Sequence, residues 1–519
     1  MAATDSSFSF HWPDSRGAGV LLHPTSFPGD FGIGSFGAEA RSFIDFLFEA
    51  EFQFWQVCPL GPTGFGDSPY QCFSAFAGNP YLIDLPELIE LGMLQMEDVN
   101  PLRSLPHDRV DYGGIYNLKW TVLRLAFDRF LQNSSEIEPY GNFSAFKKEK
   151  ADWLEPFVYY QALKKEFNGA PWYDWPKNCR TYGRFKDSEW LTDALVEEAE
   201  AQRFYQYLFF GQWKNLREYA GERQIQIIGD IPIFVSGDSA DAWAHPEIFQ
   251  FDSSGLKPKA VAGVPPDYFS ADGQYWGNPL FDWDFLRQTN YAWWKDRLAA
   301  NFDLYDIVRI DHFRGFEAYW SIPFGSKTAR NGKWVKGPGL PFFEEIQKSF
   351  PEAKIIAEDL GTLTPEVFEL LEATALPGMA VLQFAFGGAS DNFYLPHNLD
   401  KNSVIYAGTH DNDTTLGWFQ SIDEATRDHV RTYLRISGEE IAWDFVRTAY
   451  ASVCRLAIVT LQDLMSLDGS ARFNTPGVPD GNWQWRYSEG ALEKLRNESS
   501  EYLAEIAGLY GRDRASRKR

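Results

Sequence analysis

The chain has 519 residues, of which 44% are hydrophobic and 23% charged, so it can bury a sizeable core, and neither a disordered nor a fibrous protein is expected. Its 48 basic and 72 acidic residues give a formal net charge of −24, which would repel the phosphate backbone of a nucleic acid. Aromatic residues make up 17% of the chain, more than core packing normally requires, and their flat faces can stack on sugar rings, so a neutral polymer is the favoured ligand.

The N-terminal segment, residues 1–7, lacks a basic stretch followed by an apolar run. The chain also has no run of about eighteen apolar residues, so no membrane span is expected. Its cysteines, Cys58, Cys72, Cys179 and Cys454, are too few and too scattered for a disulfide framework and show no paired spacing for zinc. These features predict a cytoplasmic protein with reduced thiols.

Eight short apolar runs follow one another along the chain, with longer amphipathic stretches between several of them. This alternation predicts an α/β fold, a (β/α)8 or TIM barrel with a parallel sheet. The predicted strands are 20–22, 54–60, 225–234, 307–313, 354–359, 380–386, 404–408 and 458–461.

Two long connections interrupt this series, and long loops of a barrel rise above its C-terminal face, where the chemistry takes place. A mainly helical insertion is predicted over residues 85–220. A second insertion, over residues 250–300 and rich in Pro, Gly and Asp, is predicted to form part of a substrate groove. Nothing after the last run suggests a separate C-terminal β-sandwich, so residues 1–519 are expected to be one catalytic unit. The basic end from Arg512 onward is expected to be a solvated tail.

Acidic residues stand at or near the C-terminal ends of several of the predicted strands. They are Asp230, Asp311, Glu358 with Asp359, and Asp411 after His410. One such residue alone could be a helix cap or part of a loop salt bridge. Several that converge on one face of a barrel would cost stability unless they are used, so a paired-carboxylate site that acts on glycosidic bonds is favoured.

Cleavage of a glycosidic bond needs one acid to protonate the leaving oxygen and one carboxylate to attack or shield the anomeric carbon. Arg309 lies two residues before Asp311 and projects to the same side of a strand, so its charge would keep Asp311 ionised, as a nucleophile requires. A plain ion pair at the barrel mouth is the alternative for Arg309. Glu358 has an apolar approach, and neighbouring carboxylates would raise its pKa, as an acid/base requires. Asp359 faces the opposite way and is expected to be structural.

Three segments carry a resemblance to a known family. Arg309-Ile-Asp311-His-Phe-Arg-Gly, Ala357-Glu358-Asp359-Leu-Gly and Gly408-Thr-His410-Asp411-Asn-Asp resemble motifs of glycoside hydrolase family 77, the amylomaltases. The resemblance extends over nearly the whole chain. Further matching segments are Leu22-His-Pro-Thr-Ser, Gly66-Asp-Ser-Pro-Tyr70-Gln, Gly229-Asp230-Ile-Pro-Ile, Val264-Pro-Pro-Asp-Tyr-Phe, Gly273-Gln-Tyr-Trp276-Gly-Asn278-Pro and Ala471-Arg-Phe-Asn474-Thr-Pro-Gly.

The resemblance implies a retaining 4-α-glucanotransferase that moves a segment of an α-1,4-glucan, such as a maltodextrin, amylose, starch or glycogen, to glucose or another glucan. It implies that Asp311 is the nucleophile, Glu358 the general acid/base and Asp411 the transition-state stabiliser. It further implies sugar contacts by Arg309, His410, Tyr70, Asp230, Trp276, Asn278 and Asn474, and a loop with Tyr268 and Phe269 that overhangs the groove. No cofactor and no metal are expected, and the assembly is expected to be a monomer or weak homodimer.

Other interpretations stay open at this point. A hydrolase of the α-amylase class would use the same residues with water as acceptor, and a non-catalytic maltodextrin-binding protein could share the fold. Residues 410–413 resemble metal ligands only superficially, since no EF-hand or HExxH spacing is present. At Phe65 some family members have Tyr in an auxiliary glucan-stacking surface, so a secondary site there is in doubt.

Overall fold

The central sheet is formed by eight parallel strands, one from each predicted run. The computed structural model describes residues 10, 12, 15–64, 66–133, 136–266, 271–361 and 363–516. The strands are β1 (Gly17–Leu21), β2 (Phe54–Gln56), β5 (Gln226–Ile231), β8 (Ile307–Ile310), β11 (Ile355–Ala357), β12 (Gly378–Val381), β13 (Ser403–Tyr406) and β14 (Leu456–Thr460).

The sheet closes almost completely on itself. Its strand order is β11-β8-β5-β2-β1-β14-β13-β12, and β1 pairs with both β2 and β14. At the remaining seam the backbone N–H of Ala357 donates to the carbonyl of Pro377 over 2.9 Å. The prediction of an α/β TIM barrel is therefore confirmed.

Successive residues of each strand pack on opposite sides of the barrel wall. On β8, Ile307 belongs to the cluster that fills the barrel interior, whereas Val308 packs outward in the main core. Arg309 therefore points inward, like Ile307, and Asp311 continues on this side at the carboxyl end of the strand. The alternation aims charged groups into the mouth of the barrel.

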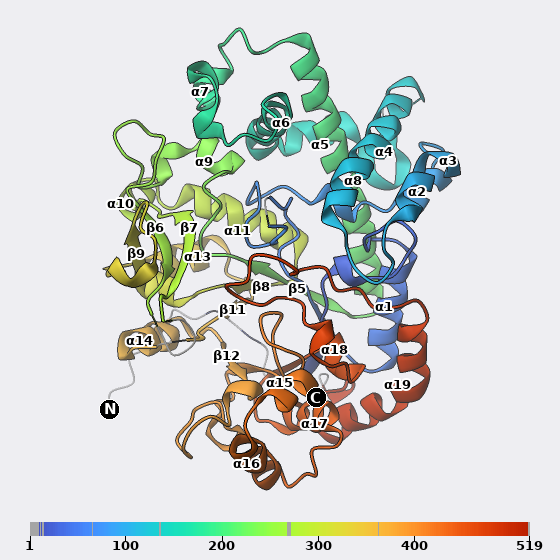
Figure 1. The fold of residues 1–519 in the computed structure, drawn as a ribbon, viewed down its shortest axis with the longest axis vertical. Coiled ribbons are helices and arrows are strands. Elements are labelled where there is room, and N and C mark those ends of the chain that lie inside the picture. The colour runs from blue at the N-terminus through green and yellow to red at the C-terminus, as the bar shows by residue number, and fades with distance from the viewer. Residues whose placement is uncertain are drawn as a thin grey trace.

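Between β2 and β5 the chain forms a group of helices that lies above the barrel strands in Figure 1. Its members are α2 (Leu85–Glu90), α3 (Met96–Val99), α4 (Tyr112–Asn133), α5 (Phe143–Glu149), α6 (Ala151–Glu166), α7 (Tyr182–Phe185) and α8 (Asp193–Glu222), with a short hairpin, β3 (Glu136–Ile137) and β4 (Gly141–Asn142). The Thr192 hydroxyl caps α8 by accepting from Leu195 N–H. Stacked rings such as Phe130 and Phe204, with centroids 4.7 Å apart, hold α4 against α8.

The remaining helices cover the barrel or lie in its loops. They are α1 (Ala38–Glu49), α9 (Ala240–Ala244), α10 (Trp283–Gln288), α11 (Ala292–Leu304), α12 (Arg314–Glu317), α13 (Leu340–Ser349), α14 (Pro365–Thr374), α15 (Thr415–Ser421), α16 (Glu424–Leu434), α17 (Ile441–Ala451), α18 (Leu461–Leu464) and α19 (Ala491–Leu509). None of the helices within the described ranges is long and apolar enough to cross a membrane.

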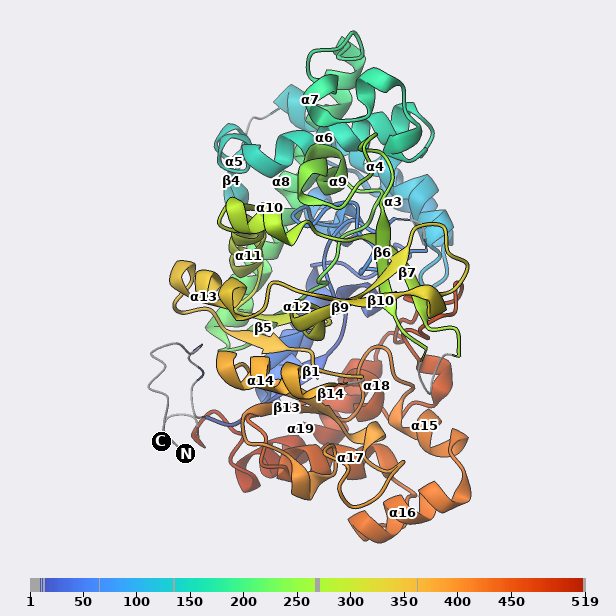
Figure 2. The same ribbon diagram turned by 90° about the vertical axis from the view of Figure 1, so that its left-hand side faces the viewer.

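A second, antiparallel sheet was not predicted. It has the order β10-β9-β6-β7 and stands beside the barrel in Figure 2. Its strands are β6 (Ala260–Val264), β7 (Gln274–Pro279), β9 (Ala318–Pro323) and β10 (Lys333–Lys336). Because β6 and β7 come from the second insertion and β9 follows β8 closely, this sheet places residues of β7 next to the barrel mouth.

The C-terminal segment is not a solvated tail as far as Ser516, so that expectation was wrong. Arg512 is fully buried and donates to the backbone carbonyls of Gly17, Tyr450 and Cys454, among others. The side chain of Gln53 donates in turn to the Arg512 carbonyl. Since Gly17 begins β1, Arg512 closes the N-terminal end of the barrel.

Candidate active site

Three carboxylates stand at or beyond the carboxyl ends of barrel strands. Asp311 directly follows β8, Glu358 directly follows β11, and Asp411 lies in the loop after β13. The backbone N–H of Asp311 donates to Ile231 O over 2.9 Å, and that of Glu358 to Ile310 O over 3.0 Å. These bonds continue the strand pairing past the last strand residues, so they fix the backbone positions from which both side chains project.

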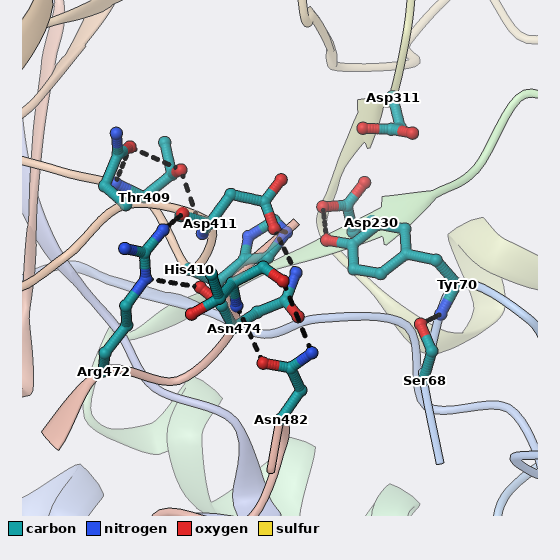
Figure 3. Close-up of polar contacts among 12 residues, drawn as sticks. Ser68, Tyr70, Asp230, Asp311, Thr409, His410, Asp411, Arg472, Asn474 and Asn482 are labelled. Atoms are coloured by element: carbon teal, nitrogen blue, oxygen red, sulfur yellow. Dashed lines mark hydrogen bonds and ion pairs between the residues drawn. The ribbon is translucent and has the colours of Figure 1, made fainter. Parts of the chain in front are cut away.

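Arg309 lies within β8, two residues before Asp311, and its guanidinium is buried. Its Nη1 donates to Oδ2 and Oδ1 of Asp230 over 2.6 and 2.8 Å, and to Oδ1 of Asp311 over 3.1 Å. The hydroxyl of Tyr70 donates to Asp230 Oδ2 over 2.8 Å, a contact visible in Figure 3. Arg309 therefore forms both a buried ion pair with Asp230 and a contact with the predicted nucleophile.

The electrostatic balance at Asp311 differs from the sequence expectation. Burial raises the pKa of Asp311, and the positive charge of Arg309 opposes this rise. The negative charges of Glu358, Asp230 and Asp411 raise the pKa further, and the net result lies well above the usual range for an aspartate. One guanidinium that is shared with Asp230 cannot offset burial and three like charges.

Glu358 is held by backbone amides on both of its oxygens. Oε2 accepts from His312 N–H over 2.6 Å and Oε1 from Leu360 N–H over 2.7 Å. Burial raises the pKa of Glu358, while Arg309 and these two amides act against the rise. The net rise is the direction that a proton donor near neutral pH requires.

Asp359 faces away from this site. Its Oδ1 accepts from Met379 N–H over 2.6 Å, which ties β11 to β12, and burial raises its pKa to about 7. This geometry agrees with the structural role that the sequence analysis assigned to Asp359.

His410 and Asp411 lie side by side in the loop after β13. The ring of His410 stacks on Tyr70, with centroids 5.0 Å apart and planes 15° apart, and its Nε2 lies 3.4 Å from Asp411 Oδ1. Burial lowers the pKa of His410, so its ring is neutral at pH 7. The side-chain amide of Asn474 donates to Asp411 Oδ1 over 2.6 Å (Figure 3). The Asp411 carboxylate is 48% exposed and therefore faces open space.

Two predicted contact residues come from β7. The ring of Trp276 meets His312 edge-on at 4.9 Å between centroids. Asn278 donates to Val235 O over 2.8 Å and accepts from the Gln71 side chain over 3.0 Å, next to Tyr70. The structure thus brings the predicted site residues of the described ranges into one connected region. Three others that the sequence analysis considered, Tyr268, Phe269 and Phe65, lie outside the described residues.

Sequence reasoning gave no role to three residues that hold this site together. They are Gln71, His312 and Arg472, which donate to Asn278, Glu358 and Asp411 respectively. Each lies within a segment that the sequence analysis had singled out, so position in the motif was the only available signal. Within the described part of the chain, no group of three His, Cys, Asp or Glu side chains could hold a metal ion.

Comparison with known proteins gives matches along nearly the whole chain. Residues 22–493 match the model of a family described as 4-alpha-glucanotransferase. A 4-alpha-glucanotransferase of Thermus thermophilus is 48% identical over 498 residues, which cover 94% of this chain and 98% of that protein. One from Clostridium butyricum is 44% identical over 494 residues, 95% and 100% of the two chains. The solved structure of an amylomaltase from Streptococcus agalactiae in complex with acarbose is 38% identical and superimposes with a TM-score of 0.91, covering 96% and 100%.

Proposed function

We propose, from the premise that this chain belongs to the 4-alpha-glucanotransferase family, that it transfers a segment of an α-1,4-glucan to the 4-hydroxyl of glucose or another glucan. The observation that carries the proposal is the placement of Asp311 and Glu358 at the ends of the paired strands β8 and β11. Arg309 donates to both Asp311 and Asp230 there. Two carboxylates in different environments, one bound by a guanidinium and one by two amides, suit a double displacement.

In the first half of the reaction, Glu358 gives its proton to the glycosidic oxygen as the bond from that oxygen to the anomeric carbon breaks. A carboxylate oxygen of Asp311 forms a new bond to the anomeric carbon, which produces a glucosyl ester. The leaving glucan departs with a hydroxyl at its new end. Arg309 orients the attacking carboxylate through its 3.1 Å contact with Oδ1.

In the second half, the 4-hydroxyl of an acceptor sugar gives its proton to Glu358 and attacks the anomeric carbon. The ester bond to Asp311 breaks, and both carboxyl groups return to their starting states. Two successive inversions leave the configuration of the donor sugar retained.

The other residues bind and stabilise in this scheme. Asp411 stabilises the positive charge that develops on the sugar ring, and the stacked rings of Tyr70 and His410 form a wall beside it. Trp276, on β7 of the antiparallel sheet, contributes a further aromatic surface. The same proposal includes glucose as acceptor, glucan contacts by Tyr268 and Phe269, a monomer or weak homodimer, and a cytoplasmic location.

Pure maltotriose tests the function. A transferase converts it into glucose and longer maltodextrins, which chromatography of the products resolves. Glucose and maltose alone would identify a hydrolase with water as acceptor. Unchanged maltotriose, bound but not converted, would identify a binding protein and overturn the proposal.

A further inference from the structure

Asp411 is anchored differently from the other two carboxylates of the site. Asp311 and Glu358 directly follow strands, whereas Asp411 lies in a loop five residues after β13 ends at Tyr406. Its side chain is 48% exposed, against 28% for Asp311. A loop carboxylate needs other contacts to keep its position, because the strand pairing does not extend to it.

Those contacts come from a second loop, which follows α18. The Asn474 side chain donates to Asp411 Oδ1 over 2.6 Å, and Asn474 N–H donates to the carbonyl of His410 over 3.1 Å. The side chain of Asn412 accepts from both the N–H and the hydroxyl of Thr409, which tightens the turn that carries Asp411. The position of Asp411 is therefore set where two loops meet.

Arg472 joins these two loops with a single planar group. Its Nε donates to the Asn474 carbonyl over 2.8 Å, and its Nη2 donates to the Asp411 carbonyl over 2.7 Å. Figure 3 shows the guanidinium beside both loops. The two carbonyls belong to the same two residues whose side chains form the 2.6 Å bond.

The chemistry of the guanidinium suits this bridge. Its N–H groups point in fixed directions within one plane, so they set the separation of two acceptors, which the single ammonium of a lysine does not. Among the described residues Arg472 forms no ion pair, so its charge is not there to neutralise a carboxylate partner. The contacts that it makes are those of a clamp on the backbone.

We propose that Arg472 is a positioning residue for the glucan transfer. It holds Asp411 and Asn474 in the position from which Asp411 stabilises the positive charge that develops on the sugar. The inference rests on the proposed function, because it assigns Arg472 a part in that reaction. A displacement of about 1 Å in a catalytic group can cost about 100-fold in rate, so the clamp should act on kcat more than on KM.

The test compares Arg472→Ala and Arg472→Lys with the unaltered enzyme on maltotriose. Both variants are expected to lose about 10- to 100-fold in kcat with KM changed by less than about three-fold. Guanidinium ion, added well below denaturing concentrations, should restore part of the kcat of Arg472→Ala and little of that of Arg472→Lys, whose ammonium occupies the space.

Arg486 provides a matched control. It is buried, and its guanidinium likewise donates to backbone carbonyls, those of Phe27, Gly29 and Pro106. Arg486→Lys should lower the melting temperature while the kcat of the folded enzyme stays within about two-fold of the unaltered value. A purely structural role for Arg472 would give this same pattern.

Three results would overturn the proposal. They are a kcat of folded Arg472→Ala within about two-fold of the unaltered enzyme, a rise in KM at unchanged kcat, which would mean direct substrate binding, and an absence of rescue by guanidinium. Failure of the underlying function is distinguishable, since the unaltered enzyme would then produce no longer maltodextrins from maltotriose.

Discussion

Asp311 combines two properties that are usually opposed in a nucleophile, since it contacts a guanidinium and yet its pKa is raised well above the usual range. The cause is that Arg309 is shared with Asp230, while burial and the three neighbouring carboxylates disfavour a negative charge on Asp311. The double displacement needs Asp311 ionised and Glu358 protonated, so the active form carries one proton on these two groups.

The pH profile of kcat/KM follows from this requirement. Activity requires ionised Asp311, so it falls as the pH drops through the raised pKa of that group. We expect the acidic limb to lie above pH ~4, the ordinary value for an aspartate. Initial rates on maltotriose across the pH range in which the fold is intact measure the limb. A midpoint at or below the ordinary value would contradict the electrostatic account.

The nucleophile is tested by Asp311→Ala. This change removes the atom that forms the glucosyl ester, so disproportionation should fall by more than about 10³-fold. Glucan binding should be largely kept, because the stacked Tyr70 and His410 rings are untouched. Rate assays and calorimetric titration with a maltodextrin give the two quantities. Turnover close to that of the unaltered enzyme would remove Asp311 from its role.

At the scale of elements, the C-terminal segment after α19 contributes to the stability of the barrel. Arg512→Ala would leave several buried carbonyls without their donor, including those of Gly17, Tyr450 and Cys454. We expect a loss of at least about 3 kcal/mol in the free energy of unfolding, measured by urea denaturation.

A chain that ends before Arg512 should show a comparable loss of stability. Lys494→Ala, an exposed change on α19, should stay within about 0.5 kcal/mol of the unaltered protein. Equal stability of the Arg512 variant and the Lys494 variant would show that the buried contacts contribute nothing.

The elements differ in how far sequence alone could predict them. Barrel strands are apolar runs that end at polar residues, so the sequence could predict β5, with Asp230 near its end, and β8, with Asp311 directly after it. The second sheet could not be predicted, because most residues of β7 and β10 are exposed or half-buried and so form no apolar run, and β6 pairs with β7 through a register shift between Val261 and Gly263. Arg512 and Arg472 were missed for one shared reason: their acceptors are backbone carbonyls, which composition and motif spacing do not reveal.

At the scale of the whole molecule, a net charge of −24 surrounds a site that we propose binds an uncharged polymer. Electrostatic steering acts on charged ligands and weakens as salt screens it, whereas a neutral glucan experiences neither effect. The KM for maltodextrin should therefore change by less than about two-fold between low and about 0.5 M sodium chloride. A steep dependence on salt would indicate an anionic or cationic ligand instead.

The pairing of β1 with β14 also constrains the synthesis of the protein. Residues Gly17–Leu21 are translated several hundred residues before their partner, Leu456–Thr460. At a translation rate of about 5 to 20 residues per second, one edge of β1 waits on the order of half a minute or longer for its partner. An unpaired strand edge is prone to wrong pairing, so this edge of β1 needs protection in the nascent chain until β14 has emerged.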